Sequence, residues 1–364
     1  MLKRYAQSFV LLLFIFLLNG CWDQRLLNEL FIVIGEGVEK KEDKLIVRTA
    51  FVSEEEGKQK IDVVVAEAGT LQGNTLIANQ FTGGTNSVSD ILYTVMSSEV
   101  AKEIELLSLF SVDYVSSSNV LKLIPIVTDE EMHQVFEIIE TKNDYKYTAG
   151  LLEDAAYDTI TTSTNLQKLL PLLYDPAMDF TLPYLTIKQN KLKISGIALF
   201  HDKKYSGSTL LDGDATFLLL MANQKGTRAR IEVQITEFDA PFYVLSEIKK
   251  SKSEINIDRV NSGKIKASID LSLQVFIQET SNVNQYAKHE SSLNKILENH
   301  FTEKAKGIIQ TLQEANCDVF GFGRELRAYY PEVWKTLDWE TQYPSILIEP
   351  HISVEIINMS LMDF

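Results

Sequence analysis

The first residues of this chain limit what the rest of it can become. Two basic residues precede an uncharged apolar run, Phe9–Leu18, which closes on Gly20 and Cys21. A basic start, an apolar middle and a small-residue end are typical of an export signal. The apolar run is about half of the roughly 20 residues that a membrane-spanning helix needs, which argues against an uncleaved span. We therefore expect residues 1–20 to be removed and the rest of the chain to fold outside the cytoplasm.

The cysteine at the predicted cleavage position resembles the lipobox of bacterial lipoproteins. In such proteins the thiol becomes a thioether to diacylglycerol, and the chain is cut just before it. The resemblance implies that Cys21 is an S-diacylglycerol cysteine carrying acyl chains such as palmitate, and it leaves N-acylation of the same residue open. Two acyl chains give stable anchoring where one is marginal. The sequence therefore predicts a protein tied to a bilayer through Cys21.

Charge and cysteine content exclude several classes. The net charge is −15, and removal of Lys3 and Arg4 with the signal makes it −17. An acidic chain lacks the basic face of a nucleic-acid-binding protein, and it is repelled by anionic lipid, so attachment depends on the lipid chain. Once Cys21 is modified, Cys317 is the one thiol left, and no internal disulfide can form. Cys317 lies between helix-forming runs and is expected to be a small buried hydrophobe.

The first half of the mature chain predicts strands and then helices. Leu30–Val38 and Leu45–Val52 flank a charged turn, which favours a hairpin, and Ile61–Ala66 is a third candidate strand. The other expected elements are a helix over about Ser89–Leu107, a buried strand over Phe110–Ser116, a helix behind the capping box Thr128–Glu131, and a short helix over Leu166–Leu173 that Pro171 bends or ends.

The second half predicts long strands and one long helix. Leu182–Ile187 and Leu192–Phe200 read as another hairpin, and period-two apolar stretches over 228–279 predict strands for which antiparallel pairing is simplest. Leu293–Leu312 carries one apolar stripe at helical spacing, and Ile346–Ile357 is a last strand.

These patterns predict a multidomain α+β fold. Mixed or antiparallel sheets would be covered by helices, and a C-terminal domain would combine a large sheet with a long amphipathic helix. We expect a signal peptide at residues 1–20, an N-terminal region at 21–190 and a C-terminal domain at 191–364. The N-terminal region would form either one unit or two subdomains.

The sequence contains no motif for catalysis, a metal or a cofactor. Gly35-x-Gly37 and Gly321-Phe322-Gly323 lack the third glycine of a dinucleotide loop and are expected to serve the backbone. The five histidines form no metal-ligand pattern, and Asp212 with Asp214 lacks the twelve-residue calcium pattern. Trp334 and Trp339 predict a packed aromatic corner, with an aromatic ligand shelf as the alternative.

Three blocks of residues together resemble one family. The start reads Gly20-Cys21-Trp22-Asp23-x-Arg25-x-Leu27-Asn28-Glu29, and the centre reads Gly196-Ile197-Ala198-Leu199-Phe200. The end reads Asp318-x-Phe320-Gly321-Phe322-Gly323, followed by Pro331, Trp334 and Trp339. This chain resembles the C subunits of spore germinant receptors, the Ger(x)C lipoproteins.

The resemblance implies a place and a role. Such a protein would be a non-enzymatic subunit on the outer face of the spore inner membrane of an endospore-forming bacterium. It would work with membrane-spanning A and B subunits in nutrient-triggered germination, without a cofactor, and no catalytic residue is carried over. Whether it binds the nutrient itself is open. A solute-binding lipoprotein of a membrane transporter is the alternative, and it would require two α/β lobes with parallel strands. A lipid-anchored hydrolase is a third possible class, for which the sequence contains no motif.

Overall fold

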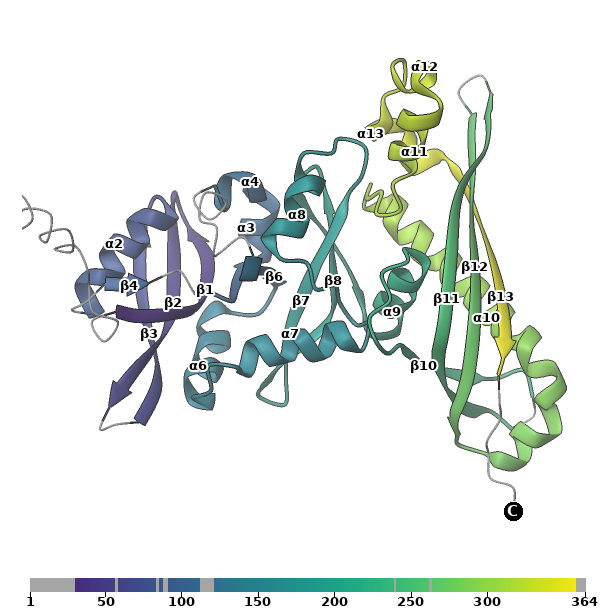
Figure 1. The fold of residues 1–364 in the computed structure, drawn as a ribbon, viewed down its shortest axis with the longest axis horizontal. Helices are drawn as coiled ribbons and strands as arrows, with labels where there is room; N and C mark the ends of the chain where they lie inside the picture. Colours follow the sequence, from purple (N-terminus) through teal and green to yellow (C-terminus); the bar gives the residue numbers. More distant parts are fainter. Residues whose placement is uncertain are drawn as a thin grey trace, which may run out of the picture.

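The computed structural model describes residues 30–55, 58–82, 85–87, 91–111, 121–238, 240–261 and 264–357. The protein is α+β, as the sequence predicts, with two mixed sheets and helices packed on each (Figure 1). In these ranges, no helix is both long and apolar enough to cross a membrane. The expected signal 1–20 and the expected lipidation site Cys21 lie outside the described residues.

Sheet A is built from nine strands in the order β3-β2-β1-β5-β6-β7-β8-β9, and β4 pairs with the start of β1. The neighbours from β1 through β5 and β6 to β7 run parallel, and the β3-β2-β1 and β7-β8-β9 ends are antiparallel. Both predicted hairpins in this region are confirmed. The strands are β1 Leu30–Lys41, β2 Lys44–Glu55, β3 Lys58–Ala68, β4 Thr85–Ser87, β5 Tyr93–Ser97, β6 Ile124–Thr128, β7 Phe180–Lys188, β8 Lys191–His201 and β9 Lys204–Leu211.

Helices cover both faces of sheet A. One apolar cluster joins a face of the sheet to α3, α4 and α8, with α2 at its margin, and a second joins the other face to α6 and α7. The helices are α2 Leu71–Thr82, α3 Ser98–Glu103, α4 Leu106–Leu109, α6 Met132–Lys142, α7 Tyr147–Tyr157 and α8 Leu166–Leu173. The predicted short helix with Pro171 inside it is therefore confirmed as α8.

Two glycines of β1 allow close packing on this sheet. A Cβ on Gly35 would lie 2.2 Å from the ring of Tyr93, and one on Gly37 would lie 2.3 Å from the ring of Phe136. A larger residue at either position would have to displace an aromatic ring. The Gly35-x-Gly37 pair, expected from the sequence to serve the backbone, thus makes room for two aromatic side chains.

Two local predictions for sheet A are wrong. The expected helix over Ser89–Leu107 is instead strand β5 followed by α3 and α4, because β5 lies in the sheet interior between β1 and β6 and is buried on both faces. The expected capping box fails because Thr128 ends β6 and donates its hydroxyl to the Leu185 carbonyl, so α6 begins after Glu131. Most of the expected strand over Phe110–Ser116 falls outside the described residues.

Sheet B has the order β10-β11-β12-β13 and lies at the C-terminal end of the molecule (Figure 1). The strands are β10 Arg230–Ile235, β11 Phe242–Asn261, β12 Lys264–Thr280 and β13 Leu347–Ile356. The expected antiparallel pairing holds for the first three, whereas β13 returns parallel to β12 after the helices.

A 32-residue helix, α10 (Val283–Glu314), packs along sheet B. At 1.5 Å per residue it is about 48 Å long. Its buried residues include Leu293, Leu297, Phe301, Ala305, Ile308, Ile309 and Leu312, which confirms the predicted stripe. Asn294 and Glu298 of α10 accept hydrogen bonds from the backbone N–H groups of Ile356 and Val354, so the helix also covers part of the outer edge of β13.

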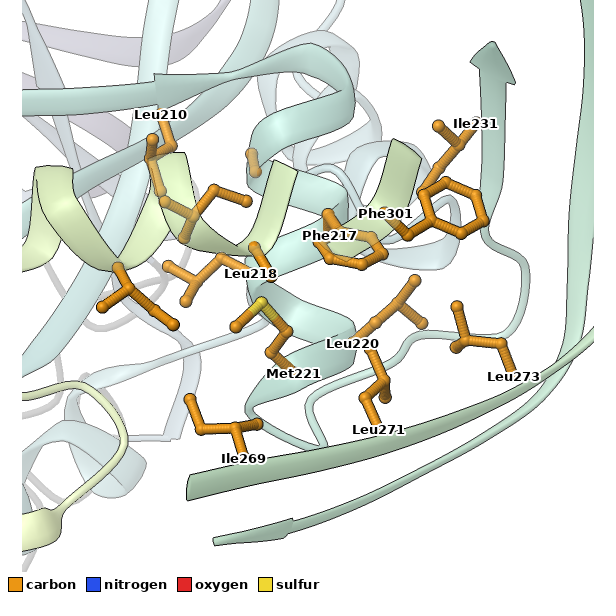
Figure 2. Packing of buried hydrophobic residues seen from close by; sticks show 14 of the residues in the cluster. Leu210, Phe217, Leu218, Leu220, Met221, Ile231, Ile269, Leu271, Leu273 and Phe301 are labelled. Carbon is orange, nitrogen blue, oxygen red and sulfur yellow. The ribbon is translucent and has the colours of Figure 1, made fainter. Parts of the chain in front are cut away.

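Helix α9 (Asp212–Met221) joins the two sheets through one apolar core. Figure 2 shows Leu218, Leu220 and Met221 of α9 beside Ile269 and Leu271 of β12. Phe217 stacks on Phe301 of α10 with ring centroids 5.1 Å apart. Ile197 and Leu199 of β8 belong to the same cluster, so sheet A and sheet B share this core.

The chain does not leave sheet A at residue 190. Gln189 and Asn190 form the tight β7–β8 turn with φ of 51° and 56°, and β8 and β9 continue sheet A beyond it. The division into regions 21–190 and 191–364 stays a prediction.

Candidate functional site

The segment behind α10 carries a buried aspartate that organises the next helix. Asp318 Oδ1 accepts hydrogen bonds from the backbone N–H groups of Gly321 (2.9 Å) and Phe322 (3.0 Å), and Oδ2 accepts one from Gly323 (2.8 Å). Gly321 has φ +77°, which favours glycine, and α11 (Phe322–Tyr329) begins directly after it. Burial raises the pKa of Asp318 to about 7 despite the three donors. The glycine-aromatic segment therefore shapes a turn, as the sequence predicts.

Asp318 is paired with Asp179, which lies just before β7 of sheet A. The N–H of Asp318 donates to Asp179 Oδ2 at 2.8 Å, and the N–H of Asp179 donates to the Asp318 carbonyl at 3.0 Å. Asp179 Oδ2 also lies 3.2 Å from Nδ1 of His201, the last residue of β8. The hydrogen bond with Asp179 raises the pKa of His201 and outweighs the effect of burial. These three residues fasten the C-terminal segment to sheet A.

Cys317 also belongs to the contact between the C-terminal segment and sheet A. Its side chain is fully buried, and its Sγ lies 3.0 Å from the carbonyl oxygen of Phe200 on β8. Burial raises the pKa of the thiol well above its ordinary value. The predicted role of Cys317 as a small buried residue is confirmed, and a thiol held neutral in this way is not an activated nucleophile.

A cavity of about 320 Å³ opens at this junction. Its lining includes Tyr174, Asp179, His201, Asn316, Trp339 and Glu340. Asn316 Nδ2 donates to the Glu340 carbonyl at 2.9 Å and lies 3.4 Å from His201 Nε2. The wall of the cavity therefore combines residues from sheet A and its α8–β7 segment with residues from the chain that follows α10.

The C-terminal aromatic residues close over Asp318. Trp334 ends α12 (Pro331–Trp334), Trp339 begins α13 (Trp339–Gln342), and their ring centroids lie 6.0 Å apart. Trp339 packs on Gly323, where a Cβ would lie 2.6 Å from the indole Nε1. Tyr343, in the 3-10 turn η4 (Tyr343–Ser345), donates its hydroxyl to the Cys317 carbonyl at 3.0 Å. The predicted packed corner is confirmed, and Trp339 also lines the cavity.

An ion-pair cluster reinforces the junction on its exposed side. Asp175 accepts from Arg324 Nε at 2.8 Å and lies 3.0 Å from Arg327 Nη1, both on α11. Burial raises the pKa of Asp175, but the Ala177 amide and the two guanidinium groups outweigh it, and the pKa lies below its usual value. The cluster ties α11 to the segment between α8 and β7.

A second connection lies at the end of α7. Arg228 donates to both carboxylate oxygens of Asp158, at 2.5 and 2.9 Å. Thr159 Oγ1 donates to the Arg228 carbonyl at 2.6 Å and accepts from the Gly226 N–H at 3.0 Å. The strand leading into sheet B is thereby held against the helical layer of sheet A.

The other residues singled out in the sequence serve packing or ion pairs. Asp212 pairs with Lys193 at 2.7 Å, and Asp214 pairs with Lys304. Across the ranges that the structure describes, no three His, Cys, Asp or Glu side chains are grouped to hold a metal ion. His289 stacks on Phe238, and His351 contacts Asp270 at 2.9 Å. His201 and Asp179 are the residues that the sequence reasoning missed at the junction.

Two known protein families match the two parts of the chain that meet at this junction. The family described as "Spore germination protein N-terminal domain" matches residues 23–187, and the one described as "Spore germination B3/ GerAC like, C-terminal" matches residues 195–360. The chain belongs to the GerAC-like family of spore germinant receptor C subunits. Both family descriptions name spore germination.

Individual relatives agree with the family. The spore germination protein GerQC of Bacillus cereus is 25% identical over 213 residues, which is 58% of this chain and 58% of the relative's length, less than two thirds. The crystal structure of the GerBC protein covers 89% of this chain and 97% of its own, with a TM-score of 0.58 and 15% identity. At that identity the likeness to GerBC shows a shared fold.

In this GerAC-like protein the junction connects the two family regions. Asp175 and Asp179 lie in the N-terminal region, and Asp318, Gly323 and Arg324 lie in the C-terminal region. Asp318 and Gly323, two of the residues that carried the sequence resemblance, thus lie at the contact with the N-terminal region.

Proposed function

We propose that this chain is the lipid-anchored, non-enzymatic C subunit of a nutrient germinant receptor, held by Cys21 at the outer face of the spore inner membrane. The observation that carries the proposal is the position of the N-terminal family region, which begins at residue 23, directly behind the lipobox-like Cys21. Confinement to a surface raises the local concentration of partners, so weak contacts can hold a complex. The partners are the membrane-spanning A and B subunits of the same receptor.

The chemistry of the junction supports a non-enzymatic role. A covalent catalyst needs a nucleophile within hydrogen-bond reach of a base. The Cys317 thiol is instead directed to the Phe200 carbonyl, and the Asp318 carboxylate is occupied by three backbone N–H groups. The transporter-binding alternative needs two α/β lobes with parallel strands, and the antiparallel run β10-β11-β12 does not supply the second lobe.

The anchor and the role are tested separately. The wild-type chain and Cys21→Ala would be expressed in a sporulating host, and the mature N-terminus would be examined by mass spectrometry together with membrane fractionation. Loss of the diacylglycerol mass and of cleavage at residue 21 is expected for the variant. Processing and anchoring like the wild type would contradict the anchor.

Deletion of the gene tests the receptor role. We expect slower germination with a subset of nutrients, because a receptor complex lacking its C subunit is incomplete. Germination with a non-nutrient trigger serves as the control. Unchanged responses to every nutrient in a host without a redundant homologue would contradict the role.

A further inference from the structure

Helix α2 differs in composition from the other described helices. Its twelve residues, Leu71–Thr82, include no Asp, Glu, Lys or Arg, although 23% of the whole chain is charged. Among the described helices of eight residues or more, α2 alone lacks a charged side chain. In a protein with a net charge of −15, an uncharged helix marks a surface that can approach an anionic membrane without repulsion.

The two sides of α2 have different surroundings. Asn74 and Ala78 are buried against the sheet, and Asn74 Nδ2 donates to the Leu45 carbonyl of β2 at 3.3 Å. Leu76, on the side of the helix opposite Asn74, is 66% exposed, and Phe81 in the last turn, about 140° around the helix axis from Leu76, is 69% exposed. Apart from tyrosines, these are the two most exposed large apolar side chains in the described part of the chain. Both apolar residues are therefore available to a partner.

The position of α2 indicates what that partner is. Thr85 of β4 follows α2 closely in the chain and pairs with Leu30, where the described chain begins. The C-terminal end of α2 therefore lies beside the point at which the chain enters sheet A. Figure 1 places α2, β4 and β1 together at the end of the molecule away from sheet B.

The length of chain before Leu30 limits the distance to the anchor. Nine residue steps separate Cys21 from Leu30, and at 3.3–3.6 Å per residue they span at most about 32 Å. A lipid on Cys21 thus keeps the bilayer within reach of α2. Leucine and phenylalanine are among the side chains that enter the membrane interface.

We propose that α2 is a membrane-contact helix, whose Leu76 and Phe81 enter the headgroup region of the bilayer that holds the Cys21 lipid. The inference rests on the proposed lipid anchor. Without Lys or Arg the helix has little affinity of its own, and the tether supplies the local concentration that makes the contact persist. The contact would orient the body so that sheet B is its part farthest from the membrane.

The test uses the lipidated full chain reconstituted into phosphatidylglycerol–phosphatidylethanolamine vesicles. Gln80 is exposed on α2, and Gln310 is exposed on α10 beside sheet B. Gln80→Cys and the matched Gln310→Cys would each carry a nitrobenzoxadiazole label, which the buried Cys317 does not take up. Nitroxide groups on the acyl chains then report depth. We expect a blue shift and loss of emission for the label at 80, and neither for the label at 310.

Substitutions separate the contact from the anchor. Leu76→Ser with Phe81→Ser should abolish the blue shift of the Gln80→Cys label while leaving the lipid mass and vesicle association unchanged. Val283→Ser with Leu347→Ser, at two exposed positions near sheet B, is the matched control and should preserve the shift. A label at 80 that remains in water on a lipidated, vesicle-bound chain overturns the inference alone. A chain that carries no lipid overturns the proposed anchor and this inference together.

Discussion

Asp179 and Asp318 are joined by two backbone-anchored hydrogen bonds although 139 residues separate them. The Asp318 N–H donates to Asp179 Oδ2 at 2.8 Å, and the Asp179 N–H donates to the Asp318 carbonyl at 3.0 Å. Asp318 is buried among these groups and uses its own carboxylate to cap α11. One short segment therefore fixes both the start of α11 and the position of sheet A relative to the C-terminal helices.

Removal of the Asp318 carboxylate should destabilise the protein. Asp318→Ala leaves three buried N–H groups without an acceptor, and each costs about 1–3 kcal/mol. We expect a loss of roughly 3–5 kcal/mol in the free energy of unfolding by urea, on that same scale. Asp338→Ala, at an exposed site that makes no side-chain cap, is the control and should change it by less than about 0.5 kcal/mol. Equal effects of the two variants would contradict the capping role.

Asp318 should also make stability depend on pH. Its folded pKa of about 7 lies above the 3.8 of an unperturbed aspartate, so the folded state binds the proton more tightly. The resulting stabilisation is complete below about pH 4 and is lost as the pH rises through about 7. The groups that face it are Asp179, Cys317 and Tyr343.

Urea unfolding of wild type and Asp318→Asn between pH 4 and pH 8 checks this slope. The wild type should lose stability relative to the variant across the interval, since the amide does not titrate. His201, whose pKa is also raised, contributes a loss in the same direction to both proteins, so it cancels in the comparison. A wild type that gains stability relative to the variant would mean that the three N–H donors, and not burial, set the pKa.

Apolar periodicity in the sequence predicts the helices and strands that have one solvent-exposed side, and it misses strands that are buried on both sides. The α10 stripe from Leu293 to Leu312 and the β7–β8 hairpin were recognisable because polar residues alternate with apolar ones at a fixed period. Strand β5 has no such contrast, because four of its five residues are buried between parallel neighbours. Apolar spacing alone cannot distinguish such a strand from a helix.

The junction was predictable only in part, for a related reason. The segment from Asp318 to Gly323 was recognisable as a turn from its glycines. Its partners Asp179 and His201 lie more than a hundred residues away, and no spacing rule connects them. Their only local signal is position, since Asp179 immediately precedes β7 and His201 ends β8.

The Asp175 cluster should contribute measurably to holding α11. Asp175→Asn removes the charge that pairs with Arg324 and Arg327, and a hydrogen bond to a charged group contributes about 1.5–3 kcal/mol. Both arginines are partly exposed, so we expect about 1–2 kcal/mol after solvent screening. Asp154→Asn on the exposed side of α7 is the matched control. Trypsin cleavage after Arg324 or Arg327 should accelerate in Asp175→Asn, and an unchanged rate would argue against the cluster as a fastening.

The space around two glycines, Gly35 in β1 and Gly150 in α7, predicts opposite effects on stability when each is replaced by alanine. Gly35→Ala places a methyl group 2.2 Å from the Tyr93 ring, and overpacking of this kind costs about 1–3 kcal/mol. Gly150 lies inside α7 with no heavy atom within 4 Å of an added Cβ. Gly150→Ala should therefore stabilise the protein by up to about 1 kcal/mol through helix propensity. Thermal unfolding distinguishes the two, and a Gly35→Ala protein as stable as the wild type would contradict the packing argument.

The mature protein should contain no rapidly reacting thiol. Cys317 is fully buried and its pKa is raised by burial, so a thiol reagent can reach it only when the junction opens. Opening of a core segment costs several kcal/mol, and labelling should be roughly a thousandfold slower than in urea. The proposed lipid on Cys21 leaves no second free thiol. Stopped-flow mixing with a chromogenic disulfide reagent measures the reactivity of both thiols. One fast-reacting thiol in the folded Cys317→Ala chain would reveal an unmodified Cys21. One fast-reacting thiol that is present in the wild type and absent from that variant would show that the Cys317 contact with Phe200 is open in solution.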